Sequence, residues 1–326
     1  MRNLLPAYML FMMLFLPASC SSGQPGCTDP LALNYDPEAT EDDNSCTYQV
    51  PSAEPLWTLD LEMQIHETSG LIHWDGSLWT HNDDTDTRLY RLDPGTAEIV
   101  GDVRLPGVFN QDWEEIEQDE DYIYVGDFGN NMGNRTNLHI LRVEKASMLS
   151  GEPAIEKIWF TYSDQEDFIS SGLNQTEFDC EAFVVSSDSI YLFTKQWLSG
   201  NTTCYALPKQ PGNHVAMKKE VFNIQGQVTG ASYLEEERLL VLCAYAGLMQ
   251  PYLYLFRGFQ AEDFFSGEGM QVNLLLPFHQ VEAVTTLDGI HYYISNERSS
   301  ASYVNIPQRL HYFDLGRILE ENARGD

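Results

Sequence analysis

The chain repeats one strand–turn–strand pattern at five places, and this repetition constrains the fold more than any other feature. In each copy a short apolar strand leads through a polar turn into a second strand, which ends in a turn of polar or small residues. A period near 45 residues with four short strands per unit is typical of the blades of a β-propeller. The copies are TSGLIHWDGSLWTHNDD (68–84), DWEEIEQDEDYIYVGDFGNN (112–131), DCEAFVVSSDSIYLFTKQ (179–196), TGASYLEEERLLVLCAYAG (229–247) and VEAVTTLDGIHYYISNE (281–297).

Third and fourth strands complete each unit, except that the fifth has no fourth strand after Asp314. Segment 55–63 precedes the first copy just as the other fourth strands precede theirs. We therefore expect an all-β chain with a five-bladed β-propeller over 55–326, closed by the N-terminal strand so that no sheet edge stays free. The longest interval between copies holds an inserted polar loop at 163–178, and 316–326 is expected to form a short helical tail. The third strands lie at 88–93, 138–143, 203–208, 252–257 and 309–314, and the fourth strands at 97–105, 156–162, 217–224 and 270–276.

The first 19 residues have the order of a signal peptide. Arg2 is followed by an apolar run at 4–16, too short to span a bilayer in the mature protein, and by small residues ahead of Cys20. A cysteine at this point resembles a bacterial lipobox and predicts lipidation of Cys20; ordinary cleavage with an incidental Cys20 is the alternative. We therefore expect an exported lipoprotein at the outer membrane or cell surface, joined to the membrane only through its lipid.

Residues 20–54 are expected to form a small separate module followed by a linker. The segment between Cys27 and Cys46 is dense in acids and turn residues and cannot build a core. Export through an oxidising route predicts a Cys27–Cys46 disulfide that holds it. The segment resembles a short cysteine-bounded acidic repeat of secreted Bacteroidetes proteins. Its oxygen ligands suit weak Ca²⁺ binding, and a solvated stalk is the equal alternative.

The other three cysteines lie on expected strands. One strand separates Cys180 from Cys204, which puts them about 9.5 Å apart at roughly 4.8 Å per strand. That exceeds the limit of about 7 Å between the Cα atoms of a disulfide. Cys180, Cys204 and Cys243 are therefore interpreted as buried thiols.

The charge is strongly negative, with 49 acids against 18 bases and a net charge of −31. Such a field repels nucleic acid and anionic headgroups and attracts divalent cations. We expect a monomer that does not bind nucleic acid and whose partner is a small molecule, a glycan or an envelope protein.

First strands line the channel of a propeller, so their starting residues should meet at one mouth. The carboxylates expected there cannot all stay ionised and unpaired. With hydroxyls completing the ring, every ligand is a hard oxygen, which favours Ca²⁺; the alternative is that the ring bonds backbone N–H groups and binds nothing. The candidate metal ligands are Ser69, Glu114, Glu115, Glu181, Thr229 and Glu282, with the choice between Glu114 and Glu115 left open.

Turns after the second strands surround the same mouth. Bases are scarce, so Arg135, Lys195 and Arg298 are candidates to hold an anion, with salt bridges to nearby acids as the alternative. Phe128, Trp197 and Tyr245 are expected as exposed rings. Further candidates are Asn130 and Asn131 for ligand binding, and Asp83 and Asp127 for positioning water. Neither a phosphate-binding loop nor a known nucleophile or zinc motif occurs.

Across 55–314 the chain resembles a group of secreted bacterial propellers with an Asp-Trp-Glu-Asp-Ile motif and no assigned activity. The matching residues are Ser69-Gly70-Leu71, Asn82-Asp83, Asp112–Ile116 with Glu115 in place of aspartate, Gly126–Asn131 with Arg135, and Glu181-Ala182 with Thr194-Lys195.

More distantly, the blades resemble those of calcium-dependent apyrase-type nucleotidases, through LWTHNDDT (78–85) and IYVGDFG (123–129). That resemblance implies a calcium ring in the channel and maps it onto the candidate ligands given above. Asn82 replaces the family's first turn aspartate and Asp84 its turn arginine, which removes a base where a nucleotide phosphate would sit.

Two functions follow as hypotheses. The first is a cell-surface lipoprotein whose calcium-centred propeller binds a small molecule, glycan or envelope partner at the channel mouth. The second is a calcium-dependent hydrolase of phosphorylated or ester substrates.

Overall fold

The computed structural model describes residues 23–30, 32–47, 49–301 and 304–324. The chain divides into two compact units, Met1–Gln49 and Val50–Asp326. The expected signal peptide and Cys20 lie outside the described residues. None of the described helices has the length and apolar character needed to cross a membrane.

The first unit is held by the Cys27–Cys46 disulfide, which confirms that prediction. Its two short strands, β1 (Pro25–Gly26) and β2 (Glu41–Asp42), pair in parallel. Asp36, Asp42 and Asp43 each accept a backbone N–H two residues further on, at 2.9–3.0 Å. These carboxylates therefore act first as turn acceptors that shape the loops.

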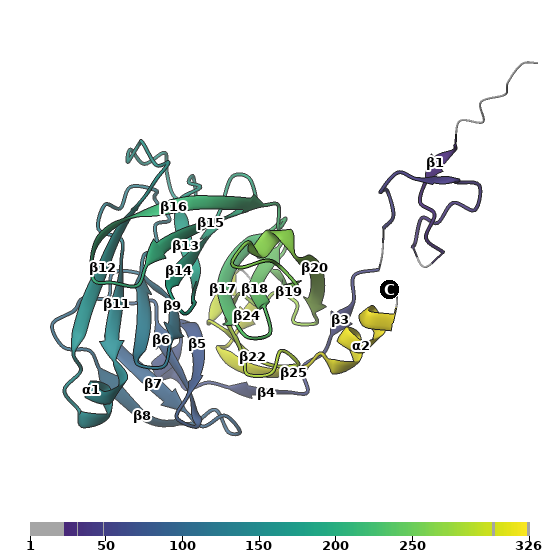
Figure 1. Ribbon diagram of the computed structural model, residues 1–326. Helices are drawn as coiled ribbons and strands as arrows, with labels where there is room; N and C mark the ends of the chain where they lie inside the picture. The colour runs from purple at the N-terminus through teal and green to yellow at the C-terminus, as the bar shows by residue number, and fades with distance from the viewer. Residues whose placement is uncertain (1–22, 31, 48, 302–303, 325–326) are drawn as a thin grey trace, which may run out of the picture. The chain divides into compact units, whose positions relative to one another are not determined.

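The second unit is almost entirely β-structure with a propeller-like arrangement, so the all-β prediction is confirmed (Figure 1). Its strands form groups of four hydrogen-bonded neighbours. The first group is β5 (Thr68–Trp74), β6 (Ser77–Asn82), β7 (Arg88–Leu92) and β8 (Ile99–Arg104), and the second is β9 (Trp113–Gln118), β10 (Tyr122–Asp127), β11 (His139–Glu144) and β12 (Ile155–Tyr162). The third group is β13 (Asp179–Val185), β14 (Ser189–Lys195), β15 (Thr202–Pro208) and β16 (Gly212–Phe222), and the fourth is β17 (Gln227–Leu234), β18 (Leu239–Ala246), β19 (Gln250–Arg257) and β20 (Glu268–Leu274). The fifth group is β21 (Val281–Thr286), β22 (His291–Asn296), β25 (Arg309–Asp314) and β4 (Trp57–Asp60).

The last group joins the two ends of this unit. β4 pairs antiparallel with β25, as Figure 1 shows. Trp57 stacks on Tyr312 with ring centroids 5.1 Å apart, and Arg309 donates to Asp60 at 2.8 Å.

Two further pairings tie strands across groups. β12 and β16 pair in parallel, which joins the second and third groups into one eight-stranded sheet. β3 (Ser52–Ala53), within the expected linker, pairs in parallel with β20. The remaining described elements are η1 (Met63–Ile65), α1 (Lys145–Ser150), η2 (Phe264–Ser266), β23 (Ser299–Ala301), β24 (Val304–Ile306) and α2 (Gly316–Arg324).

Five hydrophobic clusters hold neighbouring groups together. Each cluster takes its side chains from two successive groups, and one of them combines Leu71 and Leu78 of the first group with Ala283 and Leu310 of the fifth. The first strands β5, β9, β13, β17 and β21 contact one another in succession, and β21 also contacts β5. Cys180, Cys204 and Cys243 are buried and unpaired within these clusters, as predicted.

Candidate functional site

A β-bulge interrupts each first strand near its start. In β9, β13, β17 and β21 the bulge adds one residue that has no partner on the second strand, and that residue is Glu114, Glu181, Thr229 or Glu282, respectively. In β5 the register shifts just after Ser69. A bulge re-aims a side chain that regular pleating would direct elsewhere. The bulges therefore sit at the positions that the sequence marked as a ring.

A cavity of about 520 Å³ lies where these bulges meet. Among the described residues that line it there are seven carboxyl side chains and one basic side chain, Lys195. The residues that line the cavity are Glu67, Ser69, Asp83, Asp112, Glu114, Asn131, Asn174, Glu181, Lys195, Trp197, Tyr245, Gly247, Met249, Gln280, Glu282 and Glu297.

Of the expected ring, Ser69, Glu114, Glu181 and Glu282 line this cavity. The two hydroxyls are bound to neighbouring first strands: Ser69 donates to the Glu114 carbonyl and Thr229 to the Val281 carbonyl, both at 2.6 Å. Thr229 is fully buried and does not line the cavity.

Glu115 is turned away from the cavity and binds backbone. Its carboxylate accepts the N–H of Ile116 at 3.0 Å and the N–H of Ala231, on β17, at 2.9 Å. Gly70 makes room for it, because a Cβ at Gly70 would stand 2.9 Å from the Glu115 Oε1 and 2.5 Å from the Ile116 nitrogen. Adjacent glutamates thus have opposite roles, since only Glu114 faces the cavity.

The three ring carboxylates inside the cavity are deeply buried and close enough to act on one another. Burial raises the pKa of Glu114 well above its usual value, and the charge of Glu181 raises it further. Burial also raises the pKa of Glu181 and of Glu282, against the effect of Lys195. Glu282 is 5 % exposed, and its Oε1 has no hydrogen-bond partner among the described residues.

Lys195 is the counter-charge of the cavity. Its Nζ lies 3.2 Å from Oε1 of Glu181, 4.8 Å from the Trp197 ring centroid and 5.5 Å from that of Tyr245. The indole of Trp197 donates to the buried Asp179 at 2.7 Å, which holds the ring in place. The lysine therefore stands between two aromatic rings with its ammonium toward the carboxylates.

Asp83 also lies in the cavity, together with two carboxylates that the sequence analysis did not select, Glu67 and Glu297. Burial, then the charge of Glu67, raises the pKa of Asp83 to about 8. Burial, then the charge of Glu282, raises the pKa of Glu297 to about 10. Asp112 belongs to the same set, with a pKa raised to about 6 by burial and by Asp179.

A signal for these additional residues was present in the sequence. Residues two apart on a strand point to the same side, and an acid or amide stands two positions before every ring residue. These residues are Glu67, Asp112, Asp179, Gln227 and Gln280. Three of them, Glu67, Asp112 and Gln280, line the cavity.

Asp127 and Arg135 form an ion pair outside the cavity. Arg135 Nη2 lies 2.6 Å from Asp127 Oδ1, Nη1 donates to the Gly129 carbonyl at 2.7 Å, and both side chains are buried. Asn130 is also buried, with its Oδ1 accepting the N–H of Arg135, whereas Asn131 lines the cavity. Arg298 is exposed and does not line the cavity.

Two of the three aromatic side chains that were expected to be exposed are buried. Tyr245 is 9 % exposed, although it lines the cavity, and Phe128 belongs to the core. Phe128 was expected to be exposed, but it is fully buried and packs edge-to-face on Phe183 at 5.6 Å. The inserted loop at 163–178 takes a place at the mouth: Asn174 lines the cavity and its N–H donates to the Asn131 carbonyl at 2.8 Å.

No protein-family model and no curated protein matches the chain. Among solved structures, the WD40 repeats of RRP9 match with a TM-score of 0.42 and 8 % identity, over 82 % of this chain and 99 % of that one. U3-55K matches with a TM-score of 0.37 and 6 % identity, over 76 % and 68 %. At these values the likeness carries no functional conclusion.

Proposed function

We propose that the cavity binds a calcium ion at Glu114, Glu181 and Glu282, and that this ion helps to hold a small ligand. The observation that carries the proposal is the Oε1 of Glu282, which is buried without a hydrogen-bond partner in the described part of the chain. An unpartnered buried carboxylate oxygen is costly. A cation removes that cost and the repulsion between the three carboxylates.

The donors fit calcium. Three carboxylates, with lone pairs left on the Ser69 hydroxyl, are hard oxygen ligands of the kind that Ca²⁺ binds, six to eight at a time. Zinc prefers nitrogen and sulfur, and no histidine or cysteine is among the described residues that line the cavity. Carbonyl oxygens, water and the ligand would complete the shell.

The other side of the cavity suits a small molecule. A volume of about 520 Å³ is in the range of sites for small ligands. Lys195 offers a charge to an anionic oxygen, and Trp197 and Tyr245 offer flat surfaces beside it. A compact ligand that carries a carboxylate, phosphate or sugar hydroxyl matches this lining better than an extended protein surface does.

We further infer that the five groups of strands are the five blades of a propeller closed by β4. The pairing of β4 with β25 and the contact between β21 and β5 support this. Export and lipid attachment rest on residues 2–20, and the Cys20→Ser variant tests them, because it should leave the membrane fraction.

A calcium-dependent hydrolase is the second candidate. Asp83 favours it, because a carboxyl group in the cavity with a pKa of about 8 can exchange protons near neutral pH. Asp127 does not support it, because this carboxylate is buried against Arg135. Turnover of phosphomonoesters, nucleotides or lactones that requires Ca²⁺ and disappears in Asp83→Asn would favour the hydrolase.

Thermal melting in Ca²⁺ and in EDTA tests the binding function. At a hundredfold excess over Kd, calcium should stabilise the protein by about 2.7 kcal/mol, which is roughly 5–10 °C for a domain of this size. Glu181→Gln/Glu282→Gln should lose that shift. The exposed pair Glu98→Gln/Glu268→Gln carries the same charge change and should keep it.

The ligand is then sought by melting in saturating Ca²⁺ with sugars, phosphomonoesters and dicarboxylates. Trp197→Ala should lose the response to the ligand and keep the response to calcium. A wild-type melting point that ignores both chelation and every compound would contradict the proposal.

A further inference from the structure

Three carboxylates form a second cluster beside the ring. Glu67 precedes β5, Asp83 follows β6, and Glu297 follows β22. One oxygen from each lies within 4.8 Å of one oxygen from each of the other two. Three evenly spaced oxygens bound to one Ca²⁺ at 2.3–2.6 Å can be at most about 4.5 Å apart. The three oxygens are therefore close to the spacing that a single ion needs, and small side-chain rotations would complete it.

The segments that carry these side chains are fixed by backbone contacts. The N–H of Asp83 donates to the Glu67 carbonyl at 3.0 Å, and the N–H of Glu67 donates to Oδ1 of Asn82 at 3.2 Å. The N–H of Arg298 donates to the His66 carbonyl at 2.8 Å. The carboxylates thus meet at the end of hydrogen-bonded main chain and not on free loops.

Glu282 supplies a second observation, beside the geometry of the cluster, that a cation belongs in this cavity. It lines the same cavity, is 5 % exposed, and its Oε1 lacks a partner among the residues described. After burial, the charge of Glu282 is the largest influence that raises the pKa of Glu297. The unpartnered glutamate therefore shares one cavity with the cluster as well as with the ring.

The charge of the cavity leaves room for more than one cation. Seven carboxylates and Lys195 line it, so full ionisation would give a charge of about −6, and one Ca²⁺ would leave about −4. Like charges this close cannot all stay ionised in a buried place. Either the carboxylates keep protons or a second ion binds among them.

We propose that Glu67, Asp83 and Glu297 bind a second divalent cation of the Ca²⁺ type, with Glu282 shared between it and the ring. The three ligands are hard oxygens, which favours Ca²⁺ over softer metals, and His66 Nε2 lies 3.5 Å from Glu67 Oε1 at the edge of the cluster. The two sites are separable, because Glu114 and Glu181 belong only to the ring and Asp83 and Glu297 only to the second cluster.

Calorimetric titration of the purified protein with CaCl₂ tests this, using Asp83→Asn/Glu297→Gln beside Glu114→Gln/Glu181→Gln. Each pair should lose one bound ion relative to wild type, or bind it at least tenfold more weakly, and the four substitutions together should lose two. Residues 23–47 are identical in all variants, so any ion held there cancels.

The outcomes separate the two proposals. If only Glu114→Gln/Glu181→Gln loses an ion, the ring stands and the second site is wrong. If only Asp83→Asn/Glu297→Gln loses one, the second site stands alone, and if neither does, both are wrong. Should the Asp83 variant not fold, crystals soaked in a lanthanide give the answer from anomalous density, which must peak between Glu67, Asp83 and Glu297.

Discussion

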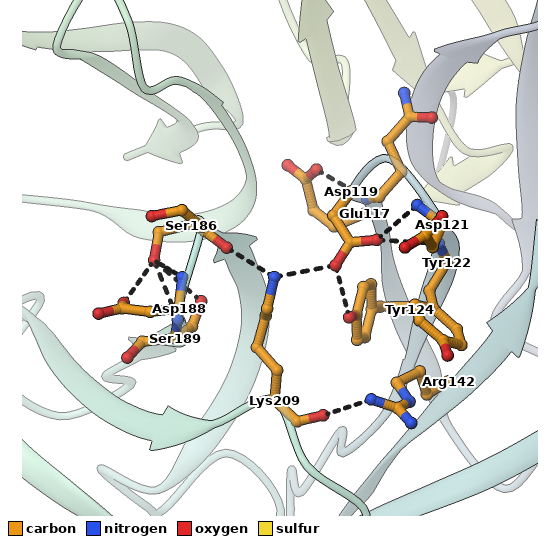
Figure 2. Close-up of polar contacts among 12 residues, drawn as sticks. Glu117, Asp119, Asp121, Tyr122, Tyr124, Arg142, Ser186, Asp188, Ser189 and Lys209 are labelled. Carbon is orange, nitrogen blue, oxygen red and sulfur yellow. Dashed lines mark hydrogen bonds and ion pairs between the residues drawn. The ribbon is translucent and has the colours of Figure 1, made fainter.

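Two regions at opposite ends of the β-hairpins stabilise their carboxylates differently. At the turn end lies the Asp119–Lys209 cluster, which we define as Asp119, Tyr124, Ser186 and Lys209. Figure 2 shows Lys209 between Asp119 and Ser186. Its Nζ donates to Oδ2 of Asp119 at 2.9 Å and to the Ser186 carbonyl at 3.0 Å. Tyr124 and two backbone N–H groups also donate to Asp119. Four donors therefore surround the two oxygens of that carboxylate.

In the mouth cavity Lys195 pairs with Glu181, but Oε1 of Glu282 has no donor among the described residues. Burial raises the pKa of Asp119, but the hydrogen bonds of Lys209 and Tyr124 outweigh it and leave that pKa below its usual value. In the cavity, burial and neighbouring acids raise the pKa of Asp83 and Glu297. In so acidic a chain the presence of carboxylates alone indicates little. What distinguishes the cavity is that seven carboxyl side chains share one basic side chain and that Oε1 of Glu282 has no donor among the described residues.

The largest expected effect is the difference in stability loss between variants of the adjacent residues Glu115, whose carboxylate has donors, and Glu114, which faces the cavity. Glu115→Ala leaves the backbone N–H groups of Ile116 and Ala231 without their acceptor, and each buried N–H lost costs about 1–3 kcal/mol. We expect Glu115→Ala to lose about 4 kcal/mol of unfolding free energy and Glu114→Ala, in EDTA, less than about 1 kcal/mol. Urea denaturation measures the unfolding free energy of both variants. Equal losses would contradict the different roles assigned to Glu114 and Glu115.

A smaller effect is expected at the Asp119–Lys209 cluster. Lys209→Met removes a donor from Asp119 and from the Ser186 carbonyl, and should cost about 2 kcal/mol, since hydrogen bonds to charged groups contribute about that much. Lys218→Met is the matched control, because its pair with Asp164 is more exposed and should contribute under about 1 kcal/mol. If the two variants unfold at the same urea concentration, the cluster does not stabilise the fold as argued.

The last expected effect is a slope with pH, and its sign follows from the pKa shifts. The folded pKa values of Asp83 and Glu297 are raised, to about 8 and about 10. Their contribution is therefore complete below the unfolded pKa values near 4 and is lost as the pH rises through the folded ones. The pKa of Asp119 is lowered, so its contribution is lost only as the pH falls toward acid.

In EDTA, Asp83 and Glu297 should each lower the unfolding free energy by about 2 kcal/mol between pH 6 and pH 8. Asp83→Asn should halve this slope, Asp83→Asn/Glu297→Gln should flatten it, and Asp119→Asn should leave it unchanged. Calcium should abolish it in wild type by holding the carboxylates ionised. A slope that Asp119→Asn removes would place its origin outside the cavity.

Local patterns in the sequence were enough to predict much of the secondary structure. Alternation and spacing predicted an all-β chain and third strands such as β7 within 88–93, because side chains on a strand alternate with a period of two. Two cysteines that bracket a segment without a core predicted the Cys27–Cys46 disulfide. The ring positions Glu181 and Glu282 were found because equivalent strands begin alike.

The tertiary structure alone decided which side chains meet in the cavity. Alternation cannot choose between Glu114 and Glu115, because a bulge changes the face of every later residue and depends on pairing with β10. Glu67 and Glu297 are 230 residues apart in the chain and meet only because the first and fifth groups are neighbours. The spacing of residues in the sequence reflects the two-residue period of a strand. Which turns come together depends instead on the order in which the groups of strands pack against one another.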